Sequence, residues 1–229
     1  MSNFTGFPTQ LIQFFKGLEA NNSKSWFQDH KKEYESFVKV PSQEFVSAMG
    51  GRLRNISPSI NAIPKVNKSL FRINRDTRFS ADKSPYKTNL GILFWDGTGK
   101  RMESPGFYFH IEGDLLMLGT GLYVFSKGAL QKYRETIVDK NAADALKSVI
   151  TDLMKNGYTI GTKHYKRIPR GFDATSDFEK EYLLYNGLTA RIEMTLPDAF
   201  FTEEILDLAF DDFKAMSGLH QWLMKYMTP

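Results

Sequence analysis

The middle of the chain carries a series of short apolar segments separated by turns, and this series limits the fold more than any other feature. The segments are rich in aromatic and aliphatic residues and cover residues 70–74, 90–95, 106–112 and 115–123. Turn residues follow the second segment at Gly97–Gly99 and the third at Gly113–Asp114. Successive strands with short connections favour an antiparallel meander, because parallel strands need long crossovers. We therefore predict that the four segments form neighbouring antiparallel strands.

Helices are expected on both sides of this β-rich region. Residues 8–55 contain three apolar stripes whose members recur every three or four positions, as in amphipathic helices. Pro41 is expected to break or restart the helix in which it lies. Further helices should begin after capping residues, which we place at Ser126, Asn141 and Thr202. A short helix is expected over residues 178–185 and a strand over residues 188–196.

Together these elements predict a single α+β domain over residues 1–229, in which an antiparallel β-sheet meander packs with helices. The domain would have a helical N-terminal segment and a C-terminal helix, and residues 1–55 could form a helical subdomain. The composition, 41% hydrophobic and 24% charged, is that of an ordinary globular protein and excludes a wholly disordered or collagenous chain.

The sequence contains no cysteine, which excludes disulfides, thiolate metal sites and cysteine nucleophiles and suits a reducing compartment. The longest uncharged apolar run, Leu115–Phe125, has 11 residues, whereas a membrane span needs roughly 20. No lysine or arginine precedes the first apolar run, unlike in a signal peptide. We therefore expect a cytoplasmic location and no membrane partner, and the oligomeric state stays open.

Positive charge is concentrated in two segments. Residues 65–87 carry a net charge of +5 and residues 163–171 a net charge of +4, while the whole chain carries only +4. The remainder of the chain is therefore net negative. Concentrated basic charge favours a local anion site if the two segments meet in space, and we predict that they lie side by side.

The first basic segment contains an unusual cluster of cations. The cluster and its tyrosine are Arg72, Arg75, Arg78, Lys83, Tyr86 and Lys87. We expect the strand to end near Arg75 and the chain to fold back as a loop. Because guanidinium groups are planar forks suited to phosphate or carboxylate, the cluster is a candidate anion clamp, to which Arg167 could contribute. Asp76 and Asp82 would orient the arginines.

Two structural alternatives remain open for the same residues. Arginine–aspartate networks also tie long loops to sheets, so Arg75 could be held by Asp76 or Asp82 while Tyr86 serves as a buried anchor. The cations could also simply lie on the surface.

The run Arg72-x-x-Arg75-Asp76-x-Arg78-Phe79-x-x-Asp82-Lys83-x-x-Tyr86 resembles the signature R-x-x-R-D-x-R-F-x-x-x-[DN]-K-x-x-Y, with the acid aligned at Asp82, so that the chain has two residues after Phe79 where the signature has three. That signature belongs to a conserved hypothetical bacterial family, domain of unknown function 2461. Similarity extends to residues 105–112, 119–123 and 166–172, and so covers nearly the whole chain. The resemblance implies an intracellular single-domain protein from a family of mostly bacterial origin. It does not indicate which activity, if any, the protein has.

A second candidate feature is the alternation of Tyr108, His110 and Glu112, which would share one face of a strand. His110 could serve as an acid–base group beside Glu112, since imidazole titrates near neutral pH. The same face could equally be the solvent side of an antiparallel strand. A metal site is not expected, because a catalytic zinc normally needs three protein ligands and only His110 and Glu112 offer a pattern.

The second basic segment forms a candidate loop with proline and glycine, and its cations are Lys166, Arg167 and Arg170. This loop could close over the same anion, or it could be an ordinary solvated loop. Phosphate-loop, dinucleotide-binding and α/β-hydrolase motifs are absent from the sequence, and no cofactor is expected.

Three hypotheses for the function follow. The first is an anion-binding site for a phosphorylated or polycarboxylate small molecule. It leaves open whether the protein is an enzyme; a hydrolase or transferase would use His110 or Asp76 as proton carrier. The second is a nucleic-acid-binding module that uses the same basic segments on phosphates. The third is a non-catalytic structural or interaction protein with a structural arginine–aspartate network.

Overall fold

A computed structural model describes residues 4–227 of the chain. The N-terminal region is helical, with α1 (Thr9–Ala20), α2 (Lys24–Asp29), α3 (Lys31–Glu33), a π-helical segment (Tyr34–Lys39) and α4 (Val40–Leu53). The helical backbone continues up to Pro41, where the α-helix α4 starts after the π-helical segment, as the restart alternative predicted. Pro41 lies in the first turn of α4, where the N–H group that proline lacks is not needed for an intrahelical bond.

Six strands form one antiparallel sheet in the order β1-β2-β3-β4-β6-β5. They are β1 (Ile60–Asn61), β2 (Asn89–Asp96), β3 (Gly106–Glu112), β4 (Leu115–Leu122), β5 (Thr159–Ile160) and β6 (Leu188–Thr195). The predicted meander of the 90–95, 106–112 and 115–123 segments is therefore confirmed, and so is the strand near residues 188–196.

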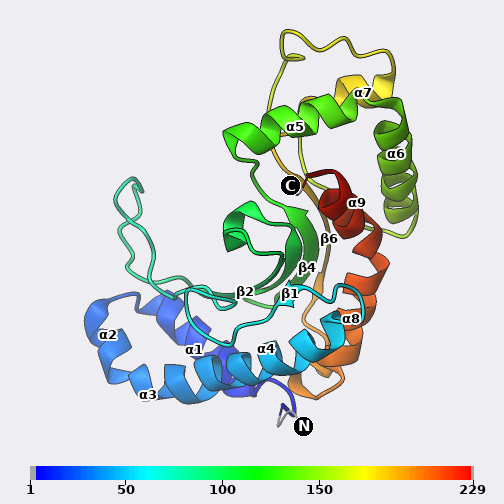
Figure 1. The fold of residues 1–229 in the computed structure, drawn as a ribbon. Coiled ribbons are helices and arrows are strands. Elements are labelled where there is room, and N and C mark those ends of the chain that lie inside the picture. Colours follow the sequence, from blue (N-terminus) through cyan, green and yellow to red (C-terminus); the bar gives the residue numbers. More distant parts are fainter. Residues whose placement is uncertain (1–3, 228–229) are drawn as a thin grey trace. The chain divides into compact units, whose positions relative to one another are not determined.

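The C-terminal half supplies the remaining helices of the described chain (Figure 1). They are α5 (Lys127–Ile137), α6 (Lys140–Lys155), α7 (Asp177–Tyr182), α8 (Ile205–Ala215) and α9 (Ser217–Met227). Short 3-10 segments lie at Arg101–Glu103, between β2 and β3, and at Asp198–Phe201, before α8. The α+β class, with helices at both ends of the chain, is confirmed. Within residues 4–227, no helix is long and apolar enough to cross a membrane.

The predicted strand at residues 70–74 is wrong: only isolated bridges join Leu70 to Ile92 and Asn74 to Tyr86. The segment changes its hydrogen-bonding partner halfway. The Phe71 N–H donates to the Gly91 carbonyl of β2, whereas the Arg75 N–H donates to the carbonyl of Pro85 within the following loop. A segment divided between two partners cannot extend a ladder along either.

Two predicted helix starts also need correction. The N-cap of α6 is Asp139, whose carboxylate accepts the Ala142 N–H at 2.9 Å, so the helix begins before Asn141. Thr202 accepts a bond from the Glu204 N–H, but α8 begins only at Ile205, and the separate helix α9 was not predicted. The predicted cap at Ser126 is confirmed, because its hydroxyl accepts the Ala129 N–H.

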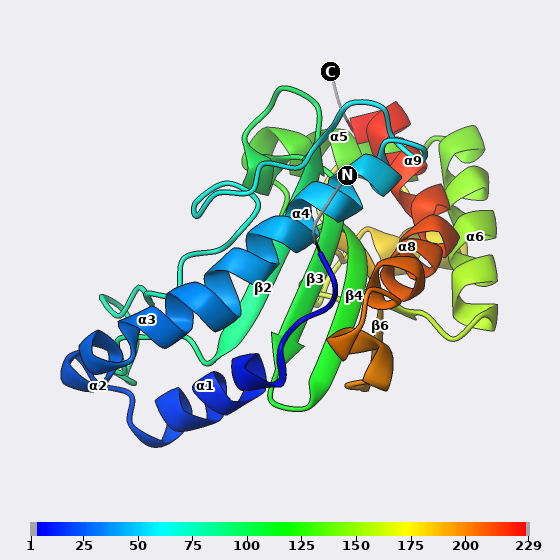
Figure 2. The same cartoon turned by 90° about the horizontal axis from the view of Figure 1, so that it is seen from below.

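The chain divides into two interleaved compact units. The first comprises residues 1–94, 108–118 and 193–211, and the second comprises residues 95–107, 119–192 and 212–229. In the first unit, α1 and α4 cover one face of the sheet (Figure 2). Phe45 of α4 is fully buried there, with its ring centroid 4.6 Å from that of Phe109 on β3.

The core of the second unit contains polar as well as apolar groups. The indole N–H of Trp222 on α9 donates to the carbonyl of Ala142 on α6 at 3.0 Å. His220, also on α9, stacks on Phe107 with ring centroids 4.6 Å apart and lies 2.9 Å from the carboxylate of Asp96. Because both partners of this pair are almost completely buried, the pair belongs to the core of the unit.

Candidate functional site

The polar face of β3 points away from the core of the first unit, as its sequence alternation predicts. Phe109 and Ile111 are buried, whereas Glu112 is exposed and Tyr108 and His110 are partly exposed. The three polar side chains are also connected. The Tyr108 hydroxyl lies 3.1 Å from Nδ1 of His110, and Nε2 of His110 lies 3.5 Å from the carboxylate of Glu112.

Tyr108 is the protonated hydroxyl at one end of this row. Burial, with a smaller effect of the Glu112 charge, raises the pKa of Tyr108 to about 12. The hydroxyl therefore keeps its proton at neutral pH and can donate to Nδ1 of His110. A neutral His110 in this arrangement carries its proton on Nε2, which faces Glu112.

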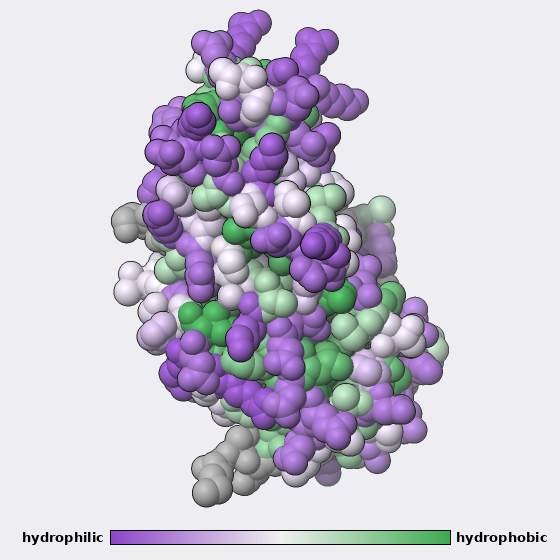
Figure 3. Space-filling view, turned by 90° about the vertical axis from the view of Figure 1, so that its right-hand side faces the viewer, coloured by the Kyte–Doolittle hydropathy of each residue, from purple (hydrophilic) through white to green (hydrophobic). Residues whose placement is uncertain are grey.

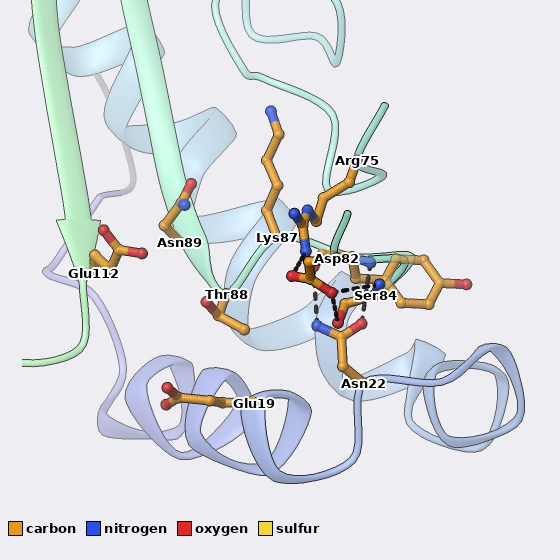
Figure 4. A pocket seen from close by; sticks show the side chains of 10 residues that line it. Glu19, Asn22, Arg75, Asp82, Ser84, Lys87, Thr88, Asn89 and Glu112 are labelled. Atoms are coloured by element: carbon orange, nitrogen blue, oxygen red, sulfur yellow. Dashed lines mark hydrogen bonds and ion pairs between the residues drawn. The ribbon is translucent and has the colours of Figure 1, made fainter. Parts of the chain in front are cut away.

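A pocket of about 360 Å³ opens in the first unit beside this row (Figure 4). The end of α1, the loop that precedes β2, the start of β2 and the end of β3 form its walls. The lining residues are Glu19, Asn22, Arg75, Asp82, Ser84, Tyr86, Lys87, Thr88, Asn89 and Glu112. Of the predicted site residues, the structure therefore brings Arg75, Asp82, Tyr86, Lys87 and Glu112 together here.

Arg75 forms an ion pair with Asp82 in the wall of the pocket. Asp82 also accepts bonds from the Ser84 N–H at 2.9 Å and the Ser84 hydroxyl at 2.6 Å. These bonds, together with the Arg75 guanidinium, hold the pKa of Asp82 well below its usual range. Arg75 is thus paired with Asp82, one of the two partners that the structural alternative named, and it also lines the pocket.

Arg78 and Lys83 lie outside the pocket lining and bind within their own loop. Nε and a terminal nitrogen of Arg78 donate hydrogen bonds to the Asp76 carboxylate at 2.9 and 2.6 Å. These bonds lower the pKa of Asp76 to about 2. The Lys83 ammonium donates to the carbonyl of Thr77 at 2.9 Å. A carboxyl group that is ionised so strongly is suited to orienting Arg78 and is a poor proton carrier near neutral pH.

Tyr86 is an anchor for the loop, as the structural interpretation predicted. Its side chain is buried and stacks on Phe27 with ring centroids 4.3 Å apart. Asn22 holds its backbone on both sides, since the Asn22 amide donates to the Tyr86 carbonyl at 2.9 Å and accepts the Tyr86 N–H at 3.1 Å. Sequence reasoning missed Asn22, because the two residues are 64 positions apart and no local pattern links them.

The remaining cations have different surroundings. The Lys87 ammonium lies 5.3 Å from the centre of the Phe71 ring, at the pocket. Arg72 is exposed and lies outside the pocket lining, although its charge helps to lower the pKa of Asp76. Lys166, Arg167 and Arg170 are exposed in the second unit. Their predicted position beside Arg75 requires contact between the two units and stays a prediction.

The pocket contains charges of both signs, which the basic sequence segments did not predict. Arg75 and Lys87 are its cations, and Glu19, Asp82 and Glu112 are its anions. Sequence reasoning missed Glu19, which lies alone at the end of an amphipathic helix, and the polar residues Ser84, Thr88 and Asn89. Among the residues that the structure describes, no three histidine or acidic side chains form a group that could hold a metal ion.

One further side of the molecule shows few apolar residues. In Figure 3, hydrophilic residues cover most of the visible face, and the hydrophobic residues form small separate groups.

Comparison with known proteins identifies a family but no activity. The family model described as conserved hypothetical protein (DUF2461) matches residues 10–222. No curated protein matches the chain.

Proposed function

We propose a function from the pocket itself, because the chain belongs to the DUF2461 family of conserved hypothetical proteins and that membership assigns no ligand or reaction. The pocket binds a small molecule with an anionic group, either phosphate or carboxylate. The observation that carries this proposal is that Arg75 and Lys87, from the basic segment, line the same pocket.

The surroundings of Arg75 leave it able to bind a ligand. The Arg75 side chain is 27% exposed, and its interactions within the loop are the ion pair with Asp82 and a long hydrogen bond of 3.4 Å to the Ser80 hydroxyl. A guanidinium group has five N–H donors in a planar fork. The remaining donors, together with the Lys87 ammonium, can therefore bind the oxygens of one anion.

Lys87 provides the direct test. In thermal melts at matched ionic strength, phosphate or sulfate should raise the Tm of the unmodified protein above its value in chloride, because a ligand that binds only the native state stabilises it. Lys87→Ala should weaken this response. Lys65→Ala is the matched control, since it removes an exposed lysine of the same basic segment that does not line the pocket. An equal anion response in all three proteins would contradict the proposal.

Any reaction of the bound molecule, whether hydrolysis or group transfer, would take its proton carrier from His110 and Glu112. Glu112 lines the pocket, and His110 lies behind it with its other nitrogen held by Tyr108. Such a row can move a proton between Glu112, at the pocket, and His110.

A second candidate function, nucleic-acid binding, is favoured by a different observation. Phe79 is 96% exposed in the basic loop, and the Arg78 guanidinium lies 5.8 Å from the centre of its ring. An exposed aromatic ring among cations can stack on a base while the cations bind phosphates. Binding of single-stranded oligonucleotides should then weaken steeply with salt and fall on Phe79→Ala. An anion response without oligonucleotide binding would leave only the small-molecule function.

A further inference from the structure

We propose that the molecule bound in this pocket carries a protonated amine in addition to its anionic group. This inference rests on the proposed function and specifies the class of ligand. Its basis is that the pocket contains two acidic side chains, Glu19 and Glu112, whose charges the protein does not neutralise with a lysine or arginine.

The three acidic side chains of the pocket differ in their partners. Asp82 is neutralised by Arg75 and held by Ser84. The side chain of Glu19 forms no hydrogen bond or ion pair within the part of the chain that the structure describes. Glu112 faces only His110, at 3.5 Å, and His110 is already bonded to Tyr108. Two of the three carboxylates are therefore available to a ligand.

The position of these carboxylates separates them from the arginine. Figure 4 shows Glu19 and Glu112 on the side of the pocket away from the Arg75–Asp82 pair. They come from two different elements, since Glu19 lies on α1 and Glu112 at the end of β3. A purely anionic ligand that reached across the pocket would be repelled by them. A ligand with opposite charges at its two ends would bind both sides favourably.

An ammonium group fits this acidic side better than a metal ion does. Divalent cations need several ligands at once, and no three acidic or histidine residues of the described chain form a group of that kind. An ammonium has three N–H donors and needs no fixed set of ligands, so it can bind one carboxylate together with a neutral acceptor. Asn89, which also lines the pocket, offers such an acceptor in its amide oxygen.

The size of the pocket limits the ligand to a small molecule. Its volume of about 360 Å³ lies at the lower end of the range that is usual for ligand sites. The inferred class is therefore a short aliphatic amine that bears a phosphate or a carboxylate. Amines that bear a phosphate and amines that bear a carboxylate have the same charge pattern, and the experiment below distinguishes them.

Two matched pairs of probes test the inference by calorimetry or thermal shift. O-phosphoethanolamine is compared with ethyl phosphate, and β-alanine is compared with propionate, so that each pair differs in the amine. We expect the amine-bearing probe of at least one pair to bind about tenfold more tightly than its partner, and the pair that responds identifies the anionic group. Glu19→Gln and Glu112→Gln should each reduce this preference while leaving the binding of the probe without an amine equal or stronger.

Glu33→Gln is the matched control, because Glu33 is an exposed glutamate of the same unit outside the pocket lining. It should leave the preference for the amine unchanged. Equal affinities within both pairs, or a preference that survives both pocket substitutions, would overturn the inference and leave the anion-binding function intact. Failure of all four probes to bind would overturn the anion-binding function as well.

Discussion

The chain contains two acid–base pairs of similar chemistry in very different surroundings. Arg75 and Asp82 form an ion pair at the pocket, where their side chains are 27% and 58% exposed. Asp96 and His220 form the other pair at 2.9 Å, where they are 0% and 1% exposed. The first pair comes from a conspicuous sequence motif, whereas the second joins residues 124 positions apart.

The difference in burial predicts that the conspicuous pair is the less important one for stability. Exposed charges are screened by water and contribute little to the free energy of unfolding. A buried carboxylate that loses its partner keeps the full cost of its desolvation. The exposed pair, by contrast, can be rearranged at little cost in stability.

The largest effect is expected from breaking the buried pair. His220→Ala leaves the buried Asp96 carboxylate without this partner in the core of the second unit and should reduce the free energy of unfolding by about 3–5 kcal/mol. Urea denaturation followed by circular dichroism measures this loss. Asp82→Ala is the control, since it removes an exposed aspartate, and should change the Tm by about 2 °C or less. Equal losses of stability in the two variants would show that the buried pair contributes no more to the stability of the fold than the exposed pair does.

Arg75→Ala should have a smaller effect on stability and a clear effect on binding. Because the ion pair that it breaks is partly exposed, the Tm without anion should change by about 2 °C or less. The rise in Tm that phosphate causes in the unmodified protein should decrease. A large fall in Tm together with no phosphate response in either protein would establish Arg75 as a purely structural residue.

The acid limb of the stability profile should depend on the loop carboxylates. The pKa of Asp82 is lowered mainly by its bonds to Ser84 and to a smaller extent by Arg75. Asp82 therefore stabilises the fold at pH values above its unfolded pKa of about 4. This contribution is lost as the pH falls through the lower pKa of the folded state. Ser84→Ala should therefore raise the pKa of Asp82, as measured by NMR titration of its carboxyl carbon. No change in this variant would contradict the assigned cause.

The smallest effect is expected at Tyr108, whose surroundings are intermediate between those of the two pairs. Burial raises its pKa to about 12, so its contribution to stability is complete below the unfolded pKa of about 10 and is lost as the pH rises through about 12. Tyr108→Phe should remove one ionisation near pH 12 from the ultraviolet absorbance titration. An unchanged curve at that pH would show that Tyr108 titrates elsewhere.

Much of the fold could be predicted from local patterns. Short runs rich in aromatic and aliphatic residues, separated by turn residues, identified β2, β3 and β4, and the Ser126 cap located the start of α5. These signals lie within a few neighbouring residues. The segment at residues 70–74 has the composition of a strand, yet its backbone bonds are divided between β2 and its own loop. Composition does not encode which partner a backbone group will meet.

The candidate site was predictable only in part. The signature identified Arg75, Asp82 and Tyr86, and the basic cluster added Lys87; all four line the pocket. The signature also included Arg78, which binds Asp76 instead. Glu19 was missed because a lone acid at the end of a helix normally faces solvent. Its importance arises only from the fold, which places α1 beside the loop.

By itself, the sequence determined the family, the α+β class and the row of polar residues on β3, because each depends on a motif or a periodicity that is short in sequence. Only the tertiary structure decided which charges become neighbours. The acidic side of the pocket and the buried pair of Asp96 with His220 join distant parts of the chain. The physical reason is that electrostatic interactions depend on distance and burial in space, and neither quantity is written in the local order of residues.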